Sequence, residues 1–255
     1  MKLPSWLGIP ISATFFAVGP SLAVSLLLGG VLVDHALRYR DEGADELVFY
    51  DIAASADGRS LDPAWVRRVS AVIDIPFCVA GGIGDVATAA RCLAAGADKV
   101  SVNSPALARP ELIAELAAAF GRQCVVLGID SLRAADGCLR VKQFTGRPDA
   151  TQDSGRETIG WAREAVALGV GEIVLNCMDR DGVRQGYDIE ILAALVAAVD
   201  VPVIASGGAG TPAHFAAAFR AGASGALAAS VFHDRRLAIG DLKSYLAAEG
   251  IEVRP

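Results

Sequence analysis

After residue 33 the chain alternates between short runs of β-branched and other apolar residues and longer stretches rich in alanine and leucine. Alternation of this kind is typical of βα units, in which helices cover a parallel sheet. The strand-like runs are apolar throughout, as expected for strands buried on both faces. The pattern predicts seven strands, at about residues 46–51, 76–80, 99–103, 124–130, 172–177, 202–206 and 225–229.

The helices between these strands carry their own start and stop signals. Thr211 and Pro212 form an N-cap followed by proline at the first helical position, and Gly222 ends that helix. A barrel helix is expected over residues 34–43. Another is expected over residues 188–199, with one apolar face at helical spacing made of Ile189, Leu192, Leu195 and Val199.

Two parts of the chain are similar at an offset of 126 residues. FCVAGGIG at 77–84 matches VIASGGAG at 203–210, and GADKVSVNSPA at Gly96 matches GASGALAASVF at Gly222. Matched blocks in one order indicate an internal duplication, with halves of approximately residues 1–122 and 123–255 in a single domain over 1–255.

The duplication requires an eighth strand before residue 33. Eight βα units in one domain of this length are typical of a (β/α)₈ TIM barrel, here built from two duplicated half-barrels. The alternative is an open doubly wound sheet, which gives no reason for a two-fold repeat that closes on itself. The sequence therefore favours the barrel.

Residues 1–33 are atypical, with a single charged residue, Lys2, and three prolines. Three interpretations stay open. The segment is a signal peptide or membrane anchor; or it is a diverged first strand, with ISATFFAV in the barrel wall; or it reflects an altered reading frame, which changes residue identities but keeps the length.

Composition narrows the functional classes. The net charge of −6 argues against a nucleic-acid-binding surface. Five cysteines form no CxxC pair, so we expect buried, reduced thiols and a cytoplasmic protein. Three scattered histidines form no metal-ligand set. We expect no metal and no cofactor.

Small residues end four of the predicted strands, at Gly81-Gly82, Asn103-Ser104, Gly207-Gly208 and Ala229-Ser230. These ends form the catalytic face of a parallel barrel. Backbone N–H groups at such positions can approach an anion, and the following helix N-terminus adds partial positive charge. The duplication places them in two sets, which predicts a substrate with a phosphate at each end. The alternative is that the glycines only make tight βα turns.

Charged residues mark both ends of the strands. Asp130 ends CVVLGID at the mouth, where burial can tune a carboxylate for proton transfer, and we predict that it is catalytic. Asp51 and Asp181 look more like substrate-orienting or loop-bracing residues. At the opposite end, charged residues begin three strands and lie at the barrel floor, either as a salt-bridge cluster or beside a path through the floor. These floor residues are Glu46, Lys99 and Glu172.

From residue 34 to the C-terminus, seven blocks resemble the cyclase subunit of imidazole glycerol phosphate synthase, a lyase of histidine biosynthesis. The blocks are GADELVFYDIAAS, IPFCVAGGI, GADKVSVNSPAL, CVVLGID, GEIVLNCMDRDGVRQGYD, VPVIASGGAG and GALAASVFH. The resemblance implies a (β/α)₈ barrel that joins ammonia to a substrate with two phosphates, phosphoribulosyl-formimino aminoimidazole carboxamide ribonucleotide. The products are imidazole glycerol phosphate and aminoimidazole carboxamide ribonucleotide.

The resemblance also implies a partner and residue roles. Ammonia comes from a glutaminase subunit docked on the barrel floor as a heterodimer, with no nucleic-acid or membrane partner. The floor residues match the family's ammonia gate, and Asp130 matches one of two catalytic aspartates. Gly82, Asn103 and Ser104 match one phosphate site. The other substrate- and phosphate-binding positions are Asn176, Asp181, Gly182, Ser206, Gly207, Gly208, Ala229 and Ser230.

The chain departs from the family at its start. The family's first strand ends in Cys-Leu-Asp-Val, which supplies the second catalytic aspartate, whereas positions 9–12 here read Ile-Pro-Ile-Ser. A substrate-clasping lysine would fall near Gly19, and a gate arginine near Ser5. We therefore expect a poor or inactive cyclase. The alternatives are a pseudoenzyme that binds substrate and glutaminase, and the phosphoribosyl isomerase of the same pathway.

Overall fold

Eight parallel strands close into a barrel in the computed structural model, which describes residues 11–17, 22–51, 54, 55 and 57–254, with side chains from residue 32 onward. The ring closes because β4 pairs with β5 and β1 pairs with both β2 and β10. The predicted (β/α)₈ TIM barrel is therefore confirmed. Its strands are β1 (Ile11–Ala17), β2 (Glu46–Asp51), β3 (Phe77–Ala80), β4 (Lys99–Val102), β5 (Val125–Arg133), β8 (Glu172–Cys177), β9 (Val203–Ser206) and β10 (Gly225–Ala228).

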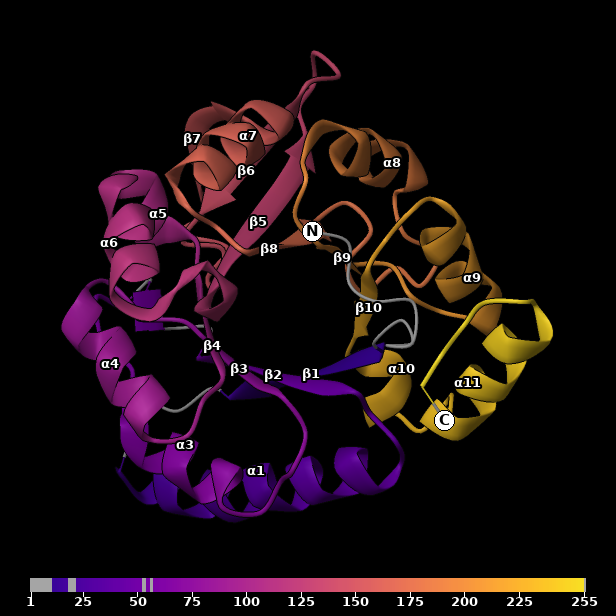
Figure 1. Ribbon diagram of the computed structural model, residues 1–255, viewed down its shortest axis with the longest axis horizontal. Coiled ribbons are helices and arrows are strands. Elements are labelled where there is room, and N and C mark those ends of the chain that lie inside the picture. Colours follow the sequence, from indigo (N-terminus) through magenta and orange to yellow (C-terminus); the bar gives the residue numbers. More distant parts are fainter. Residues whose placement is uncertain (1–10, 18–21, 52–53, 56, 255) are drawn as a thin grey trace.

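Helices form an outer ring around these strands (Figure 1). The main apolar core lies between the helices and the strands. A second, smaller cluster fills the inside of the barrel and consists of Val48, Cys78, Val126, Val174, Ile204 and Leu227. The helices are α1 (Leu22–Asp41), α3 (Pro63–Ser70), α4 (Val86–Ala94), α5 (Ser104–Ala108), α6 (Glu111–Phe120), α7 (Thr158–Leu168), α8 (Ile189–Ala198), α9 (Pro212–Arg220), α10 (Ser230–His233) and α11 (Ile239–Ala248), with a short 3₁₀ turn at Arg122–Cys124.

The offset of 126 residues found in the sequence is kept by the element boundaries. β2 and β8, β3 and β9, β4 and β10, and α4 and α9 each begin and end at this offset. Helix capping follows the same offset, since Asp62 caps α3 and Asp188 caps α8, each through a side-chain oxygen that accepts a backbone N–H. These repeated boundaries support the interpretation of two half-barrels.

One element was not expected from the sequence. β5 is extended by an antiparallel hairpin made of β6 (Leu139–Gln143) and β7 (Gln152–Glu157). Its strands are mostly polar and partly exposed, so they lack the apolar run that marked the barrel strands. The hairpin follows β5 along the chain, and the loop at its tip reaches the barrel mouth, where Phe144, Thr145 and Gly146 line the cavity described below.

The expected eighth strand is β1, and its register corrects one expectation from the sequence. Ser12 pairs with Glu46 and Ala17 pairs with Asp51. Because Glu46 begins β2, position 11 lies at the floor end of the barrel and not at the mouth, where the family's second aspartate belongs. The prolines at positions 4 and 10, and positions 5, 9 and 19, lie outside the described residues.

Three further expectations were wrong in detail. α1 starts at Leu22, well before the predicted residue 34. In α8 the buried face uses Ile191 in place of Ile189, which is 36% exposed. Of the five cysteines, all of them free, Cys138 is exposed because it lies in the turn between β5 and β6. No helix among the described residues has both the length and the apolar character needed to cross a membrane.

Candidate functional site

One cavity of about 670 Å³ lies where the carboxyl ends of the strands meet. It brings together residues from both halves of the chain that are far apart in sequence. Every substrate-binding residue predicted above lines it, together with Asp130, namely Gly82, Asn103, Ser104, Asn176, Asp181, Gly182, Ser206, Gly207, Gly208, Ala229 and Ser230. Placing both glycine-rich corners on one cavity is the arrangement that a substrate with two phosphates requires.

Asp130 is held by three hydrogen bonds. Its Oδ1 accepts from Asn176 Nδ2 at 2.8 Å, and its Oδ2 accepts from Asn103 Nδ2 at 2.8 Å and from Thr145 Oγ1 at 2.5 Å. Burial raises the pKa of this carboxyl, and the hydrogen bonds from Thr145 and Asn176 act in the opposite direction. A carboxyl poised in this way at the mouth can exchange a proton with a bound substrate.

The paired glycines have a backbone reason to be glycine, apart from any ligand. Gly81 and Gly82 both have positive φ, and a Cβ on Gly81 would lie 2.1 Å from the Asp51 carbonyl oxygen. In the second half, a Cβ on Gly208 would lie 2.3 Å from the Gly186 carbonyl oxygen. The tight-turn alternative therefore explains these residues in part, and the phosphate assignment depends on the groups that surround them.

At the first predicted phosphate site, the polar groups come from three different loops. The Gly82 N–H donates to Ser55 Oγ at 3.2 Å, and Ser104 Oγ accepts from the Phe144 N–H at 2.8 Å. Asn103 Nδ2 donates one of its two hydrogens to Asp130, which leaves the other hydrogen of the amide for a second acceptor. α5 has only five residues, so the helix dipole expected from the sequence contributes less than these local donors.

The second predicted phosphate site carries a cation that the sequence reasoning missed. Arg184 Nε donates to Ser230 Oγ at 3.2 Å, and Arg184 also pairs with Asp234. Arg184 has a positive φ of 61° in the loop after β8. The sequence signal that could have pointed to Arg184 was its position within the block MDRDGVRQGYD. That block holds several charged residues, and a single sequence does not tell which of them reaches the site.

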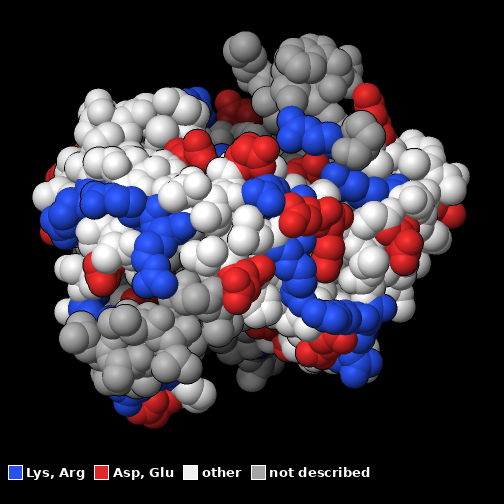
Figure 2. All heavy atoms as spheres, turned by 90° about the horizontal axis from the view of Figure 1, so that it is seen from below, with Lys and Arg blue, Asp and Glu red and all other residues white. Residues whose placement is uncertain are grey.

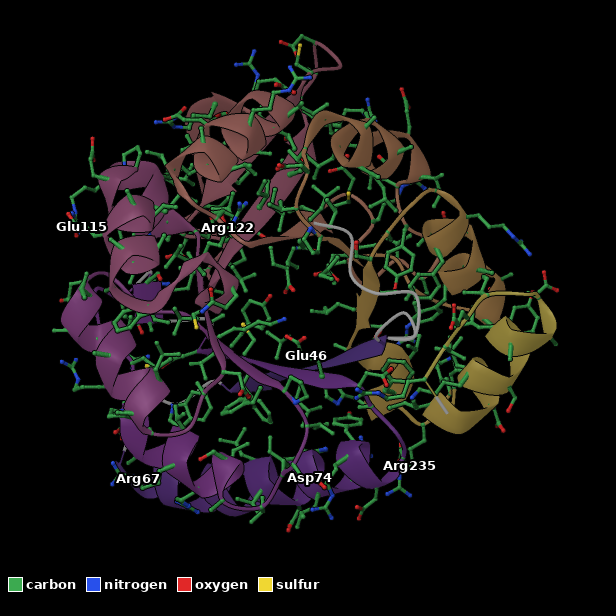
Figure 3. The ribbon with its side chains drawn as sticks, viewed as in Figure 1. Glu46, Arg67, Asp74, Glu115, Arg122 and Arg235 are labelled. Carbon is green, nitrogen blue, oxygen red and sulfur yellow. The ribbon has the colours of Figure 1, made fainter. Side chains whose placement is uncertain are left out.

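The three charged floor residues meet in space. Lys99 Nζ lies 2.8 Å from Glu46 Oε2 and 2.8 Å from Glu172 Oε2. Burial opposes the charge on Lys99, but the two carboxylates outweigh it and raise its pKa. Burial, followed by Glu172, raises the pKa of Glu46. Figure 3 shows Glu46 within the ring of strands, whereas Arg67, Asp74 and Glu115 lie on its outside.

The inner apolar cluster separates this floor from the cavity. Val48 and Val174 each follow a floor glutamate by two residues, which places them on the same face of the strand and one layer higher. Val174 and Leu227 belong to the inner cluster and also line the cavity, as does Tyr50, which packs against the cluster. The layer above the floor is therefore mostly apolar. Its polar exception is Ser101, which follows Lys99 by two residues, is buried and also lines the cavity.

The other two aspartates differ in their surroundings. Asp51 Oδ1 accepts from the Ala54 N–H at 3.2 Å and pairs with Arg59 at 3.3 Å. It therefore braces the loop after β2, as one of its two predicted roles requires. Asp181 lines the cavity beside Gly182 and raises the pKa of Asp130 through its charge. Among the described residues, no three His, Cys, Asp or Glu side chains are grouped to hold a metal ion.

Charged side chains of both signs lie on the face that Figure 2 draws, where Lys and Arg are interspersed with Asp and Glu.

Comparison with known proteins places the chain in a family. The model of the histidine biosynthesis protein family matches residues 23–238. Imidazole glycerol phosphate synthase subunit HisF of Xanthomonas campestris pv. campestris is 62% identical over 226 residues, which is 88% of each chain. The same subunit of Xanthomonas oryzae pv. oryzae is also 62% identical, and that of Stenotrophomonas maltophilia is 61% identical, each over the same share of both chains. The chain therefore belongs to the histidine biosynthesis protein family, and within it to the HisF subunits of imidazole glycerol phosphate synthase.

Proposed function

We propose that this chain is a cyclase subunit of imidazole glycerol phosphate synthase. It joins ammonia to the bisphosphate substrate phosphoribulosyl-formimino aminoimidazole carboxamide ribonucleotide and releases imidazole glycerol phosphate and aminoimidazole carboxamide ribonucleotide. The single observation that carries the proposal is the shared cavity, in which Asp130 lies with both predicted phosphate corners. Phosphate groups held at both corners fix the reacting centre of the substrate between them.

Asp130 is the proton-transfer group in this proposal. Ammonia adds to the ribulosyl carbonyl, water leaves, the ring closes and the formimino C–N bond breaks. Each of these steps moves a proton, and a carboxyl whose pKa burial raises is a stronger base than an exposed aspartate and can accept or donate that proton. Asn103 and Asn176 keep the carboxyl oriented across the cavity.

The floor and the barrel interior fit the delivery of ammonia. Lys99 bridges Glu46 and Glu172, so the entrance carries one positive and two negative side chains. Above it, the apolar inner cluster favours the neutral molecule, because a bare ammonium ion would lose its hydration there. We propose that a glutaminase subunit docks on this floor and supplies the ammonia. We also propose a cytoplasmic location, where free cysteines such as the five of this chain persist.

One observation favours a second candidate, a pseudoenzyme that binds the ligands without turning them over. β1 contains no carboxylate, so the family's second catalytic aspartate has no counterpart in Ile11–Ala17. Loss of one acid–base group lowers the rate by about 10²–10⁴-fold. No observation from the structure or the comparisons favours the phosphoribosyl isomerase over the cyclase.

The test is a steady-state assay of the purified chain with the bisphosphate substrate and excess ammonium salt, followed by separation of the products. Formation of imidazole glycerol phosphate, even slowly, supports the cyclase. Tight binding of the substrate without any product supports the pseudoenzyme. Isomerisation of the substrate's precursor without ammonia would overturn both.

A further inference from the structure

Two pairs of consecutive residues form a closed ring of contacts with Asp130. Asn103 Nδ2 and Thr145 Oγ1 both donate to Asp130 Oδ2, at 2.8 and 2.5 Å. Their neighbours bond to each other, since the Phe144 N–H donates to Ser104 Oγ at 2.8 Å. The ring thus runs from the carboxylate to Asn103 and Ser104, across to Phe144 and Thr145, and back to the same carboxylate oxygen.

The two pairs come from elements with different roles. Asn103 and Ser104 lie at the end of β4, at the first predicted phosphate site. Phe144 and Thr145 lie at the tip of the β6–β7 hairpin, which extends β5 beyond the barrel wall. Phe144 is held at a positive φ of 56°, which non-glycine residues rarely adopt, and its N–H donates to Ser104 Oγ.

Ser104 is suited to link a bound anion to this ring. The residue is 5% exposed, and in the hydrogen bonds of the described residues its Oγ acts only as an acceptor. Its hydroxyl hydrogen is therefore left for a ligand in the cavity. When that hydrogen is donated to a phosphate oxygen, the hydroxyl becomes a better acceptor for the Phe144 N–H, because consecutive hydrogen bonds polarise one another.

We infer that Thr145 is a positioning residue for Asp130, and that Phe144 and Thr145 transmit occupancy of the Ser104 phosphate site to that carboxylate. The inference rests on the proposed phosphate site and deepens it. A phosphate at Ser104 holds the hairpin tip in place, and the tip holds the carboxylate in its reactive orientation. A substrate fragment without that phosphate would leave the Thr145 bond weaker and Asp130 less well oriented.

The first test changes the Thr145 hydroxyl. Thr145→Val removes one of the donors that stabilise ionised Asp130, so the acid-side limb of the kcat/KM profile should move to higher pH by about one unit. Asp181 and Tyr50 are titratable groups that interact electrostatically with Asp130, and Lys142 lies opposite it in the β5–β6 register. None of the three is altered. Thr145→Ser keeps the hydroxyl and should retain the parent profile.

Thr151→Val is the matched control in the same loop. The Thr151 hydroxyl donates to the Arg147 carbonyl and does not touch Asp130. It should leave the profile unchanged. The positioning role would be overturned if the acid-side limb of the kcat/KM profile did not move in Thr145→Val. It would also be overturned by an equal shift in Thr151→Val, because the effect would then belong to the loop in general.

The second test needs no catalysis. Amide hydrogen exchange at Phe144 is measured by NMR with and without saturating sulfate, a dianion that does not titrate near neutral pH. Exchange should slow by about tenfold in the parent chain and not in Ser104→Ala. Sulfate binding that calorimetry detects in the parent chain and finds weakened in Ser104→Ala belongs to the Ser104 site. Such binding without slower exchange overturns the link but leaves the phosphate site standing. Absence of sulfate binding overturns the phosphate site itself, and the link with it.

Discussion

Arg184 Nε lies 3.2 Å from Ser230 Oγ, so a guanidinium group stands beside the second predicted phosphate corner. In the same structure Arg184 pairs with Asp234, a partly exposed carboxylate at the cavity edge. An anion bound at Ser230 would compete with Asp234 for this cation, and its charge would be neutralised by a side chain that the sequence did not single out.

Arg184→Ala should therefore weaken binding of the bisphosphate substrate by roughly tenfold, since a charge-assisted hydrogen bond is lost. The substrate affinity of Arg184→Lys should lie between those of the parent chain and Arg184→Ala, because a lysine keeps the charge but not the Nε geometry. Calorimetric titration measures both. Arg220→Ala, on the outer helix α9 and paired with Glu249, is the control and should leave the affinity unchanged. Equal affinities for all four proteins would remove Arg184 from the site.

Asp130→Asn should lower the rate of product formation by about 10²–10⁴-fold while substrate affinity stays within a few-fold. In the parent chain, the raised pKa of Asp130 means that protonation occurs at a higher pH than for an exposed aspartate. If the ionised form is the active one, the rate should accordingly fall on the acid side at that higher pH. A pH–rate profile of both proteins checks this, and parent-like turnover by Asp130→Asn would contradict the assignment.

Lys99→Met should destabilise the fold at neutral pH by up to about 3–5 kcal/mol, because Glu46 and Glu172 would face each other without their shared cation. The pKa of Glu46 is already raised by burial and by Glu172, and loss of Lys99 raises it further. A carboxyl with a raised pKa in the folded state binds its proton more tightly there. The stability deficit should therefore shrink as the pH falls.

Urea denaturation of Lys99→Met at pH 8 and at pH 5 measures that dependence. Lys142→Met is the comparison, since its partner Asp153 is exposed and such pairs contribute about 0–1 kcal/mol. A deficit that is the same at both pH values would show that lost packing of the lysine stem, and not carboxylate repulsion, is the cause.

Restoring an aspartate by sequence position should fail. Ile11→Asp would place the carboxyl at the floor end of β1, next to Ala226 of β10 in the register. Phe16→Asp occupies the register position beside Tyr50, which lines the cavity. We expect Ile11→Asp to keep the parent rate within about two-fold and Phe16→Asp to raise it, by up to about 10². A large gain at position 11 would show that β1 pairs in a different register.

Much of the fold was predictable from the pattern alone. Strands buried on both faces leave continuous apolar runs, and seven of these were found at nearly their final bounds. β1 was demanded by the duplication and not by its own residues. The β6–β7 hairpin was missed because its strands are short and mostly polar. Alternation is confined to a few residues such as Leu139-Arg140-Val141, of which Val141 is buried.

The residues of the candidate site likewise fall into those that the sequence predicted and those that only the structure revealed. Asp130 and the glycine corners were identified because a parallel barrel gathers strand ends at one rim, so position along the chain fixes position in space. Thr145 and Arg184 could not be found by that rule. Both lie in loops of irregular backbone. Thr145 follows Phe144, which has a positive φ, and Arg184 itself has a positive φ. The conformation of such loops depends on contacts with distant parts of the chain.

The sequence by itself determined the barrel, its repeat and the rim on which the polar groups meet, because these follow from local periodicity and from the spacing of like elements. Only the tertiary structure decided which side chains complete the site and how the first strand is aligned. Hydrogen bonds such as Thr145 to Asp130, and the pairing of Ser12 with Glu46, join segments whose mutual geometry no local pattern encodes.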